Sequence, residues 1–273
     1  PLWSRGLGDV YKRQGVFSDK SPDSRPTAKI VLSPDDHVQP DPLFLQVFNR
    51  HTNRGVYEAR MPSAGDLKVL ADATQGFPVQ WGVVTAADPT MAQHRQIAME
   101  AWRIEMCTAR TLMESYKVLR VGPDEIAKYR DGLSINTPMV RALTAVGLFD
   151  RSQASSPDSS AIQGQLSEFN DKMASTPACM WLTTADNQRA TQLLAGRAYL
   201  RVQLAATQQG LSMHPLSQAL QEYPEQAETY QAIHRLLQAN SPGQTVQMWT
   251  RLGFAPAIQP SPRRGLQAHI VRA

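Results

Sequence analysis

Apolar residues recur through most of this chain at the three- and four-residue spacing of amphipathic helices. The longest helical pattern covers residues 90–119 and leaves room for one break. A second long helix is expected to follow the cap Asp186 and to end at Gln209, because the next residue, Gly210, is a typical C-terminal glycine. The inward stripe of this helix is predicted to consist of Leu193, Leu200 and Leu204.

Short runs rich in β-branched and aromatic residues separate the helical stretches and predict strands. The predicted strands are 28–32, 79–85, 179–184 and 245–252. Shorter helices are predicted at 43–50, 67–73, 137–146 and 224–239, with one more beginning near 122 and another ending near 172. Long helices outnumber strands and alternate with them, which indicates an α+β or α/β layer fold.

The start of the chain and one internal segment differ from the rest. Residues 1–14 lack an initiator Met, show no helical or strand period and resemble translated adapter or vector sequence. We therefore interpret them as a non-native leader, with a disordered natural leader as the alternative. Residues 151–160 are rich in Ser and are predicted to form a mobile loop.

Composition narrows the classes of function. The chain's 273 residues suffice for one large domain or two modest ones. Its formal charge of +4, from 28 basic and 24 acidic side chains, is too small and too scattered to predict nucleic-acid binding. No apolar stretch approaches the roughly 20 residues that a membrane-spanning helix needs.

Cysteine and histidine usage predicts neither disulfides nor a metal site. Cys107 and Cys179 stand far apart and outside any CxxC pair, so we expect both in the core. His51, His214 and His234 have no neighbouring Cys or carboxylate at ligand spacing. The Gly-rich phosphate loop, the GxGxxG turn and the HExxH helix are absent from the sequence.

The densest group of functional side chains is the segment Arg50-His51-Thr52-Asn53-Arg54, just after a predicted helix end. A guanidinium is a planar fork suited to a phosphate or to a carbonyl-bearing heterocycle, and Thr and His add directional hydrogen bonds. The segment is therefore suited to an anionic cofactor, held by its phosphate and its ring edge at once. The alternative is a solvated basic loop.

Two further segments are candidate cofactor contacts. Residues 210–218 leave a long helix and are mostly apolar, so they suit flat contact with a ring, and His214 is interpreted as structural or ring-contacting rather than as a proton carrier. Residues 260–264 carry Arg263 and Arg264 on a proline-stiffened tail, which suits a phosphate or is simply a basic surface. Arg197 and Arg201, one helical turn apart, are expected to form ion pairs.

In this order the segments resemble the nitroreductase superfamily. Arg50, Thr52 and Arg54 match its Arg-x-Ser/Thr-x-Arg/Lys segment, and the Pro215 loop and the Arg263-Arg264 tail match its C-terminal half. The resemblance covers about residues 41–270, and strings such as 214–222 are similar to a double-length branch often labelled as twin-arginine-signal or nitroreductase-like.

The resemblance implies an α+β fold in which long helices flank an antiparallel or mixed central sheet. It implies a domain over residues 41–273, with 15–40 as the remnant of a missing N-terminal half-domain. The implied cofactor is FMN, and the implied reaction is ping-pong hydride transfer from NAD(P)H to a nitroaromatic, a quinone or a similar acceptor.

The resemblance also implies which residues contact FMN. The phosphate and pyrimidine edge would be held by Arg50, His51, Thr52 and Arg54, and the central ring would lie near Pro215, Leu216 and Ser217. Arg263 or Arg264 would take the phosphate. Neither a dedicated catalytic residue nor a metal ligand is implied, because the flavin carries the chemistry.

One segment departs from the family pattern. Where other members have Pro-Ser-x-x-Asn-x-Gln-Pro-Trp, residues 76–81 keep only Gln80 and Trp81. In dimeric members that segment serves the neighbouring subunit's flavin, so the native form is expected to be a homodimer or an internal pseudo-dimer.

Three alternatives therefore stay open: a turning-over enzyme, a protein that binds FMN without turnover, and a helical scaffold without cofactor. The sequence leaves the compartment open between the cytoplasm and, if a twin-arginine signal existed, the periplasm.

Overall fold

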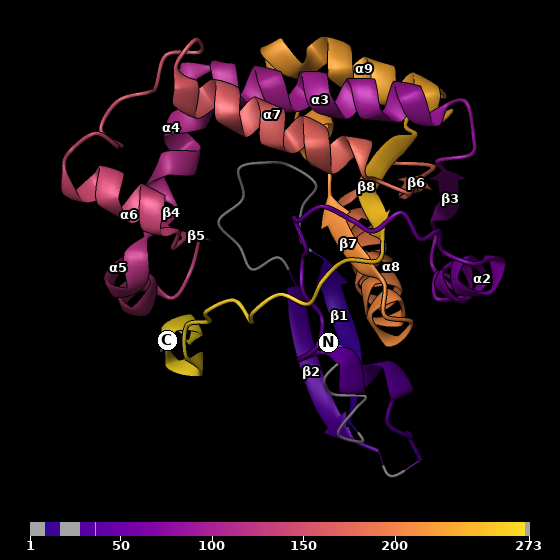
Figure 1. Cartoon of the computed structure of the whole chain (residues 1–273). Helices are drawn as coiled ribbons and strands as arrows, with labels where there is room; N and C mark the ends of the chain where they lie inside the picture. The colour runs from indigo at the N-terminus through magenta and orange to yellow at the C-terminus, as the bar shows by residue number, and fades with distance from the viewer. Residues whose placement is uncertain (1–8, 17–27, 36, 271–273) are drawn as a thin grey trace. The chain divides into compact units, whose positions relative to one another are not determined.

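The computed structural model describes residues 9–16, 28–35 and 37–270. The chain, drawn in Figure 1, forms two compact units. The first unit comprises Pro1–Ala98 and Asp171–Pro256, and the second comprises Met99–Asn170 and Ala257–Ala273.

A four-stranded antiparallel sheet forms the centre of the first unit. Its strand order is β3 (Gln80–Thr85), β6 (Ala178–Thr184), β8 (Thr245–Gly253) and β7 (Ser212–Pro215). The predicted strands at 79–85, 179–184 and 245–252 are confirmed. The sequence did not predict β7, because four residues that end in Pro show no period and satisfy few strand preferences.

The long helix α8 (Arg189–Gln208) covers one face of this sheet. The prediction of a leucine stripe is wrong in part: Leu204 is buried, but Leu193 and Leu200 are only half-buried. The buried positions are mostly small, which lets the helix approach the sheet closely; they include Ala195, Ala198, Val202, Ala205 and Ala206.

The two ends of α8 test the predicted caps. The cap is Gln188 rather than Asp186, whose Oδ1 accepts a hydrogen bond from the Gln188 backbone N–H at 2.9 Å. The Asp186 side chain therefore organises the turn before the helix. Gly210 has φ +72°, the left-handed conformation expected just after the end of a helix, so its role as the C-terminal glycine is confirmed.

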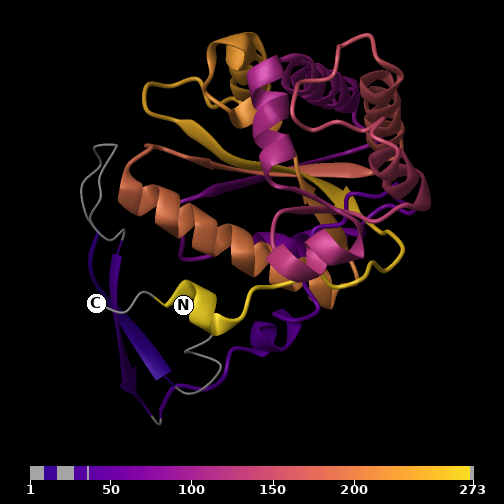
Figure 2. The ribbon, with the colours of Figure 1, turned by 90° about the vertical axis from the view of Figure 1, so that its left-hand side faces the viewer.

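The opposite face of the sheet is aromatic. Trp181 of β6 pairs in register with Trp249 of β8, and the ring of His94 lies 5.5 and 5.8 Å from their ring centroids. His94 belongs to α3 (Met91–Cys107). Gly82 of β3 lies opposite Trp181, and a Cβ there would come within 2.2 Å of the indole, so only Gly fits. Figure 2 shows α8 on one side of the sheet and α9 (Ala227–Leu236) on the other.

Shorter elements complete the first unit. Helix α2 (Ala64–Asp72) begins with a capping box between Ser63 and Asp66. The helix predicted at 43–50 is only the 3-10 turn η1 (Pro42–Gln46), capped by Asp41. Strands β1 (Asp9–Val16) and β2 (Ala28–Pro34) pair antiparallel, so a strand is present partly within residues 1–14, where the sequence showed no strand period.

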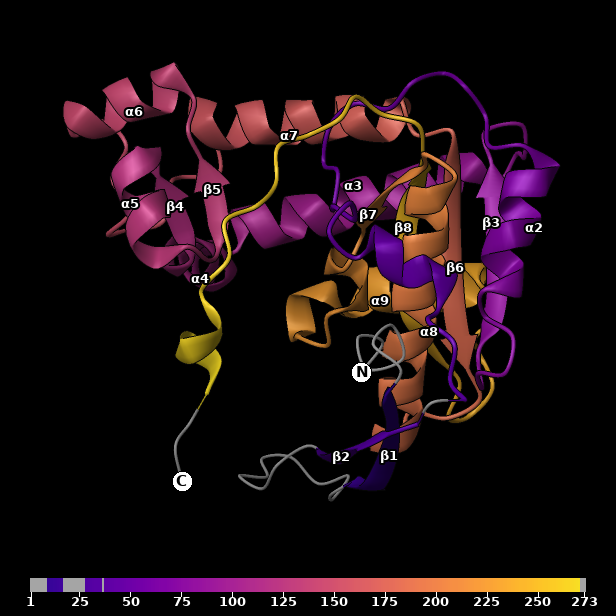
Figure 3. The same ribbon diagram turned by 90° about the horizontal axis from the view of Figure 1, so that it is seen from below.

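The second unit is mainly helical. The helical pattern 90–119 breaks once, at Thr108, between α3 and α4 (Ala109–Lys117). The remaining elements are β4 (Leu119–Val121), α5 (Gly122–Tyr129), β5 (Leu133–Ile135), α6 (Pro138–Ala145), α7 (Ser160–Ala174), which crosses the unit boundary, and η4 (Leu266–His269). Figure 3 shows α4, α5, α6, β4 and β5 gathered together. Their core includes Met106, Leu112, Tyr116 and Ile162.

Candidate flavin site

The segment 50–54 runs beside β7. Thr52 forms a parallel bridge with Met213, and the Asn53 backbone N–H donates to the Met213 carbonyl at 3.1 Å. The Asn53 side chain is buried and donates from Nδ2 to the Pro256 carbonyl at 2.9 Å. The Tyr57 hydroxyl donates to the Asn53 carbonyl at 3.0 Å. The segment is therefore fixed against the sheet edge rather than free in solvent.

Its side chains differ in how they are held. The Arg50 guanidinium donates from Nη1 to Oε1 of Gln203 on α8, at 3.1 Å. Gln203 is 4% exposed, and its Nε2 has no hydrogen-bond partner within the described part of the chain. His51 and Thr52 are half-buried, and Arg54 is exposed.

The predicted ring-contact residues follow directly from β7. Pro215 ends the strand opposite Thr250 of β8. The Leu216 side chain is buried, and its backbone N–H donates to the Trp249 carbonyl at 2.8 Å. Ser217 is exposed and precedes the 3-10 turn η2 (Gln218–Leu220). The structure thus joins two of the three predicted segments through β7.

A buried arginine that sequence reasoning missed lies under this edge. The Arg251 side chain is fully buried, opposite His214 in the register of β8 and β7. The signal in the sequence was an Arg within a continuous buried run of a strand, Trp249-Thr250-Arg251-Leu252. Its guanidinium contacts Thr176 Oγ1 (2.7 Å), the Lys172 carbonyl (2.8 Å), the Gly55 carbonyl (3.1 Å) and His214 Nδ1 (3.2 Å).

Burial dominates the electrostatics around Arg251. It lowers the pKa of the guanidinium, whose centre also lies 4.1 Å from the ring centroid of Tyr57. Burial first, and then the positive charges of Arg251, Arg54 and Lys172, lower the pKa of His214 to about 3. His214 is therefore neutral at physiological pH.

The third predicted segment belongs to the second unit. Arg263 and Arg264 are both exposed there. Arg264 Nη1 lies 3.8 Å from Oδ2 of Asp131. The same carboxylate forms a closer ion pair with Arg120, at 2.9 Å. Their assignment to the cofactor phosphate stays a prediction.

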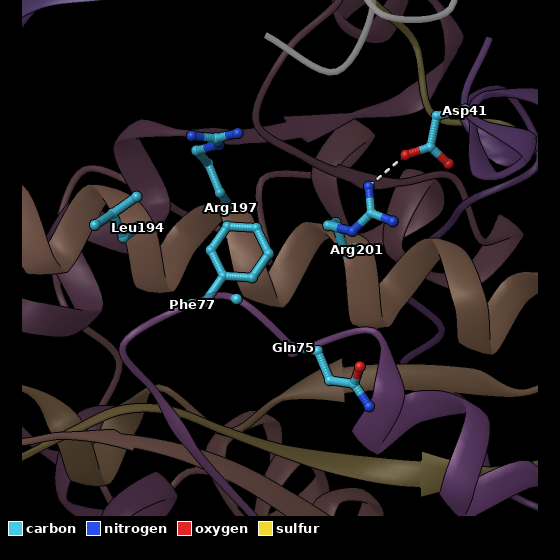
Figure 4. Close-up of a pocket in the computed structure, with 7 residues that line it drawn as sticks. Asp41, Gln75, Phe77, Leu194, Arg197 and Arg201 are labelled. Atoms are coloured by element: carbon cyan, nitrogen blue, oxygen red, sulfur yellow. Dashed lines mark hydrogen bonds and ion pairs between the residues drawn. The ribbon is translucent and has the colours of Figure 1, made fainter. Parts of the chain in front are cut away.

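A cavity of about 360 Å³ lies beside α8 in the first unit (Figure 4). Arg201 forms an ion pair with Asp41, as predicted, and the Arg197 guanidinium lies 5.6 Å from the ring centroid of Phe77. Phe77 belongs to the atypical segment 76–81, whose last two residues, Gln80 and Trp81, begin β3. The remaining lining residues are Gln75, Gly76 and Leu194.

The two cysteines do not pair with each other. Both cysteines are free, and burial raises the pKa of Cys179 to about 12, which keeps it an unreactive thiol in the core. Residues 9–16, 28–35 and 37–270 contain no group of His, Cys, Asp and Glu that could hold a metal ion. None of the described helices is long and apolar enough to cross a membrane.

No family model and no curated protein sequence matches the chain. Solved structures do match it. The FMN-dependent nitroreductase NfnB from Mycobacterium smegmatis, in complex with NADPH, is 13% identical with a TM-score of 0.50, over 85% of this chain and 98% of that one.

Two further matches have lower TM-scores. A nitroreductase with bound FMN from Desulfitobacterium hafniense is 14% identical (TM-score 0.47; 85% and 98% covered). A nitroreductase-like family protein from Bacillus cereus is 13% identical (TM-score 0.46; 85% and 96% covered). Since the likeness to NfnB extends over most of both chains and the central sheet is antiparallel between helices, the chain has the α+β fold of the nitroreductases.

Proposed function

We propose that this chain is an FMN-dependent oxidoreductase of the nitroreductase type. The observation that carries the proposal is the bridge between Thr52 and Met213, with the Asn53 N–H bonded to the Met213 carbonyl. This pairing fixes a segment with two guanidiniums, a hydroxyl and an imidazole beside the turn at residues 215–217. NfnB, which shares the fold, is FMN-dependent.

The donor set fits the chemistry of FMN. The phosphate and the pyrimidine carbonyls of a flavin are all hydrogen-bond acceptors, and the side chains of Arg50, Thr52 and Arg54 all offer donors. The Gln203 Nε2, a buried donor beside Arg50, has no acceptor among the described residues. A buried unsatisfied donor costs about 1–3 kcal/mol, so a ligand that brings acceptors is favoured at this place.

In this proposal the residues bind and orient, and the cofactor supplies the redox chemistry. Bound FMN would accept a hydride from NAD(P)H and pass it on, in a ping-pong sequence, to a nitroaromatic, a quinone or a similar acceptor. Arg50, His51, Thr52 and Arg54 would hold the phosphate and the pyrimidine edge, and the backbone of 215–217 would border the central ring. Arg263 or Arg264 would add a phosphate contact. The choice of NAD(P)H as donor is supported by NfnB, which is in complex with NADPH.

We further propose that two copies of the chain form the complete pocket. Leu45 and Phe48, five and two residues before Arg50, are 74% and 77% exposed and offer apolar surface to a partner. A partner subunit covering them would also bring its own residues to the flavin. Light scattering should therefore give twice the mass of the chain, and Phe48→Asp should give the mass of one chain.

Spectroscopy followed by turnover tests the function. The purified chain, mixed with FMN and desalted, should keep a yellow absorbance, and it should oxidise NADH or NADPH anaerobically when a quinone is added. A protein that keeps FMN but does not oxidise either donor would support the alternative of an FMN-binding protein without turnover. A colourless protein that does not quench FMN fluorescence would contradict both flavin functions.

A further inference from the structure

Arg251 is a buried cation whose hydrogen-bond acceptors among the described residues include no carboxylate. Instead, its guanidinium donates to a hydroxyl, two carbonyls and an imidazole nitrogen. These acceptors come from four places in the sequence: residue 55, the end of α7, residue 176 and β7. Hydrogen bonds to four separate segments hold the guanidinium in one orientation. The His214 ring, which accepts one of these bonds, is held with it.

The contact with His214 has a direct chemical consequence. Arg has five N–H donors and no acceptor, so the Nδ1 of His214, 3.2 Å from Arg251 Nη1, must be the acceptor. A neutral imidazole that accepts at Nδ1 carries its proton on Nε2. Protonation of both nitrogens would place two cations in contact, with Arg54 and Lys172 also close, and is therefore disfavoured.

The remaining nitrogen of His214 is placed to meet a ligand. His214 follows Met213, to which residues 52 and 53 are bound, and precedes Pro215 in the same strand. Its Nε2 has no hydrogen bond to the described residues. It is also not one of the fully buried polar atoms, so it is open to solvent. The Nε2–H is therefore accessible at the edge of the strand that borders the candidate site.

We propose that Arg251 is a positioning residue that fixes His214 as its Nε2–H tautomer, so that His214 donates a hydrogen bond to an oxygen acceptor of the bound cofactor. This inference rests on the proposed FMN function and deepens it. It gives His214 the role of a fixed donor, in contrast to a general base or a purely structural ring. Arg251 itself does not touch the cofactor.

The tautomer is measured first, in the protein without ligand. Two-dimensional ¹H–¹⁵N NMR of imidazole nitrogens distinguishes a protonated from an unprotonated nitrogen, and His214→Gln identifies the signal. We expect a protonated Nε2 and an unprotonated Nδ1 in the natural chain, and loss of this preference in Arg251→Lys, whose ammonium cannot reproduce the fork. A protonated Nδ1 in the natural chain would overturn the proposal.

The donor role is measured as FMN affinity, by quenching of flavin fluorescence. His214→Phe keeps an aromatic ring but has no donor, and we expect roughly tenfold weaker binding, the effect of one hydrogen bond to a charged or polar oxygen. His214→Gln places an amide N–H close to the former Nε2, so its affinity should stay within about threefold of that of the natural chain. Circular dichroism and thermal unfolding establish that each variant is folded.

Two failures can be told apart. If the natural chain binds FMN and His214→Phe binds it equally well, the donor role is wrong while the proposed function stands. If the natural chain does not bind FMN, the proposed function is wrong and the donor role towards FMN is wrong with it. The tautomer in the ligand-free protein then still confirms or contradicts the part assigned to Arg251.

Discussion

Two histidines of the first unit, the buried His94 and the half-buried His214, meet the same sheet in opposite surroundings. His214, at the β7 edge, accepts a hydrogen bond from Arg251, which also donates to a hydroxyl and two carbonyls. His94 packs against Trp181 and Trp249, and neither its Nδ1 nor the Trp249 Nε1 has a partner among the described residues. The comparison separates a polar network that orients side chains from an aromatic cluster that fills space. The β7 edge should therefore be sensitive to lost hydrogen bonds, and the aromatic face to changed side-chain volume.

The largest effect on stability is expected from removing the buried cation Arg251. Arg251→Met removes the donor of the Gly55 carbonyl and of His214 Nδ1, whereas the Lys172 carbonyl keeps the hydroxyls of Ser175 and Thr176. We expect the free energy of unfolding to fall by about 3–5 kcal/mol, since each unsatisfied buried group costs about 1–3 kcal/mol. Urea denaturation followed by circular dichroism measures this change.

The matched variant is His94→Phe, which removes a ring whose Nδ1 has no partner to lose. Phe is larger than His by roughly one methylene group, so crowding should cost about 1–2 kcal/mol, less than the loss in Arg251→Met. Equal losses in the two variants would show that the polar network has no special role.

The aromatic face should instead be sensitive to volume. Gly82→Ala places a Cβ within 2.2 Å of the Trp181 indole, and the crowding should cost about 1–3 kcal/mol. Its control is Gly196→Ala, at an exposed position of α8 with no atom within 4 Å, which should gain about 1 kcal/mol of helix stability. A Gly82→Ala protein as stable as the natural chain would contradict the packing of Trp181 across Gly82.

Both histidines should make stability depend on pH with the same sign. Their pKa values in the folded protein, about 4 for His94 and about 3 for His214, lie below the ordinary 6.5, chiefly because of burial. The unfolded chain therefore binds more protons below pH 6.5, and folding stability, complete above that pH, falls as the pH decreases. Each histidine contributes up to about 1.4 kcal/mol per pH unit between pH 6.5 and its folded pKa.

Urea denaturation at several pH values between 6.5 and 5 measures this slope, above the range in which carboxylates titrate. His94→Phe should remove one histidine's share of the slope and leave those of His214 and of His234, whose pKa burial also lowers. A flat stability profile in this window would contradict the burial of both imidazoles as neutral rings.

The smallest expected effect concerns the orientation of Arg50. Gln203→Leu removes the Oε1 acceptor of the Arg50 guanidinium while keeping a buried side chain of similar length. FMN affinity should fall about threefold to tenfold, the equivalent of one net hydrogen bond of about 1 kcal/mol. Gln208→Leu, exposed on the same helix, is the control and should bind FMN normally. Identical FMN affinities in the two variants would show that Gln203 does not orient Arg50 for FMN binding.

Long periodic segments were predictable from the sequence, and short or polar connections were not. The strands β3, β6 and β8 and the helices α3 and α8 follow from their apolar patterns, with Gly210 at the end of α8. The strand β7 has only four residues and no readable period.

The candidate site, too, was predictable from the sequence only in part. The cluster of side chains at 50–54 stands out in the sequence, because those residues are adjacent in the chain. The partners of Arg251 do not stand out, because they lie 37 to 196 residues away and meet only in the folded protein. Asn53 was passed over between two arginines, although its buried amide joins the segment to residue 256.

A fluorescence titration with FMN tests most directly whether residues 50–54 and the turn after β7 form a flavin site. The natural chain should quench FMN fluorescence saturably, with one FMN per chain. Arg50→Ala should bind at least roughly tenfold more weakly, whereas Arg235→Ala, exposed on α9, should bind like the natural chain. A chain that does not quench FMN, or an Arg50→Ala variant that binds as tightly as the natural chain, would contradict the site.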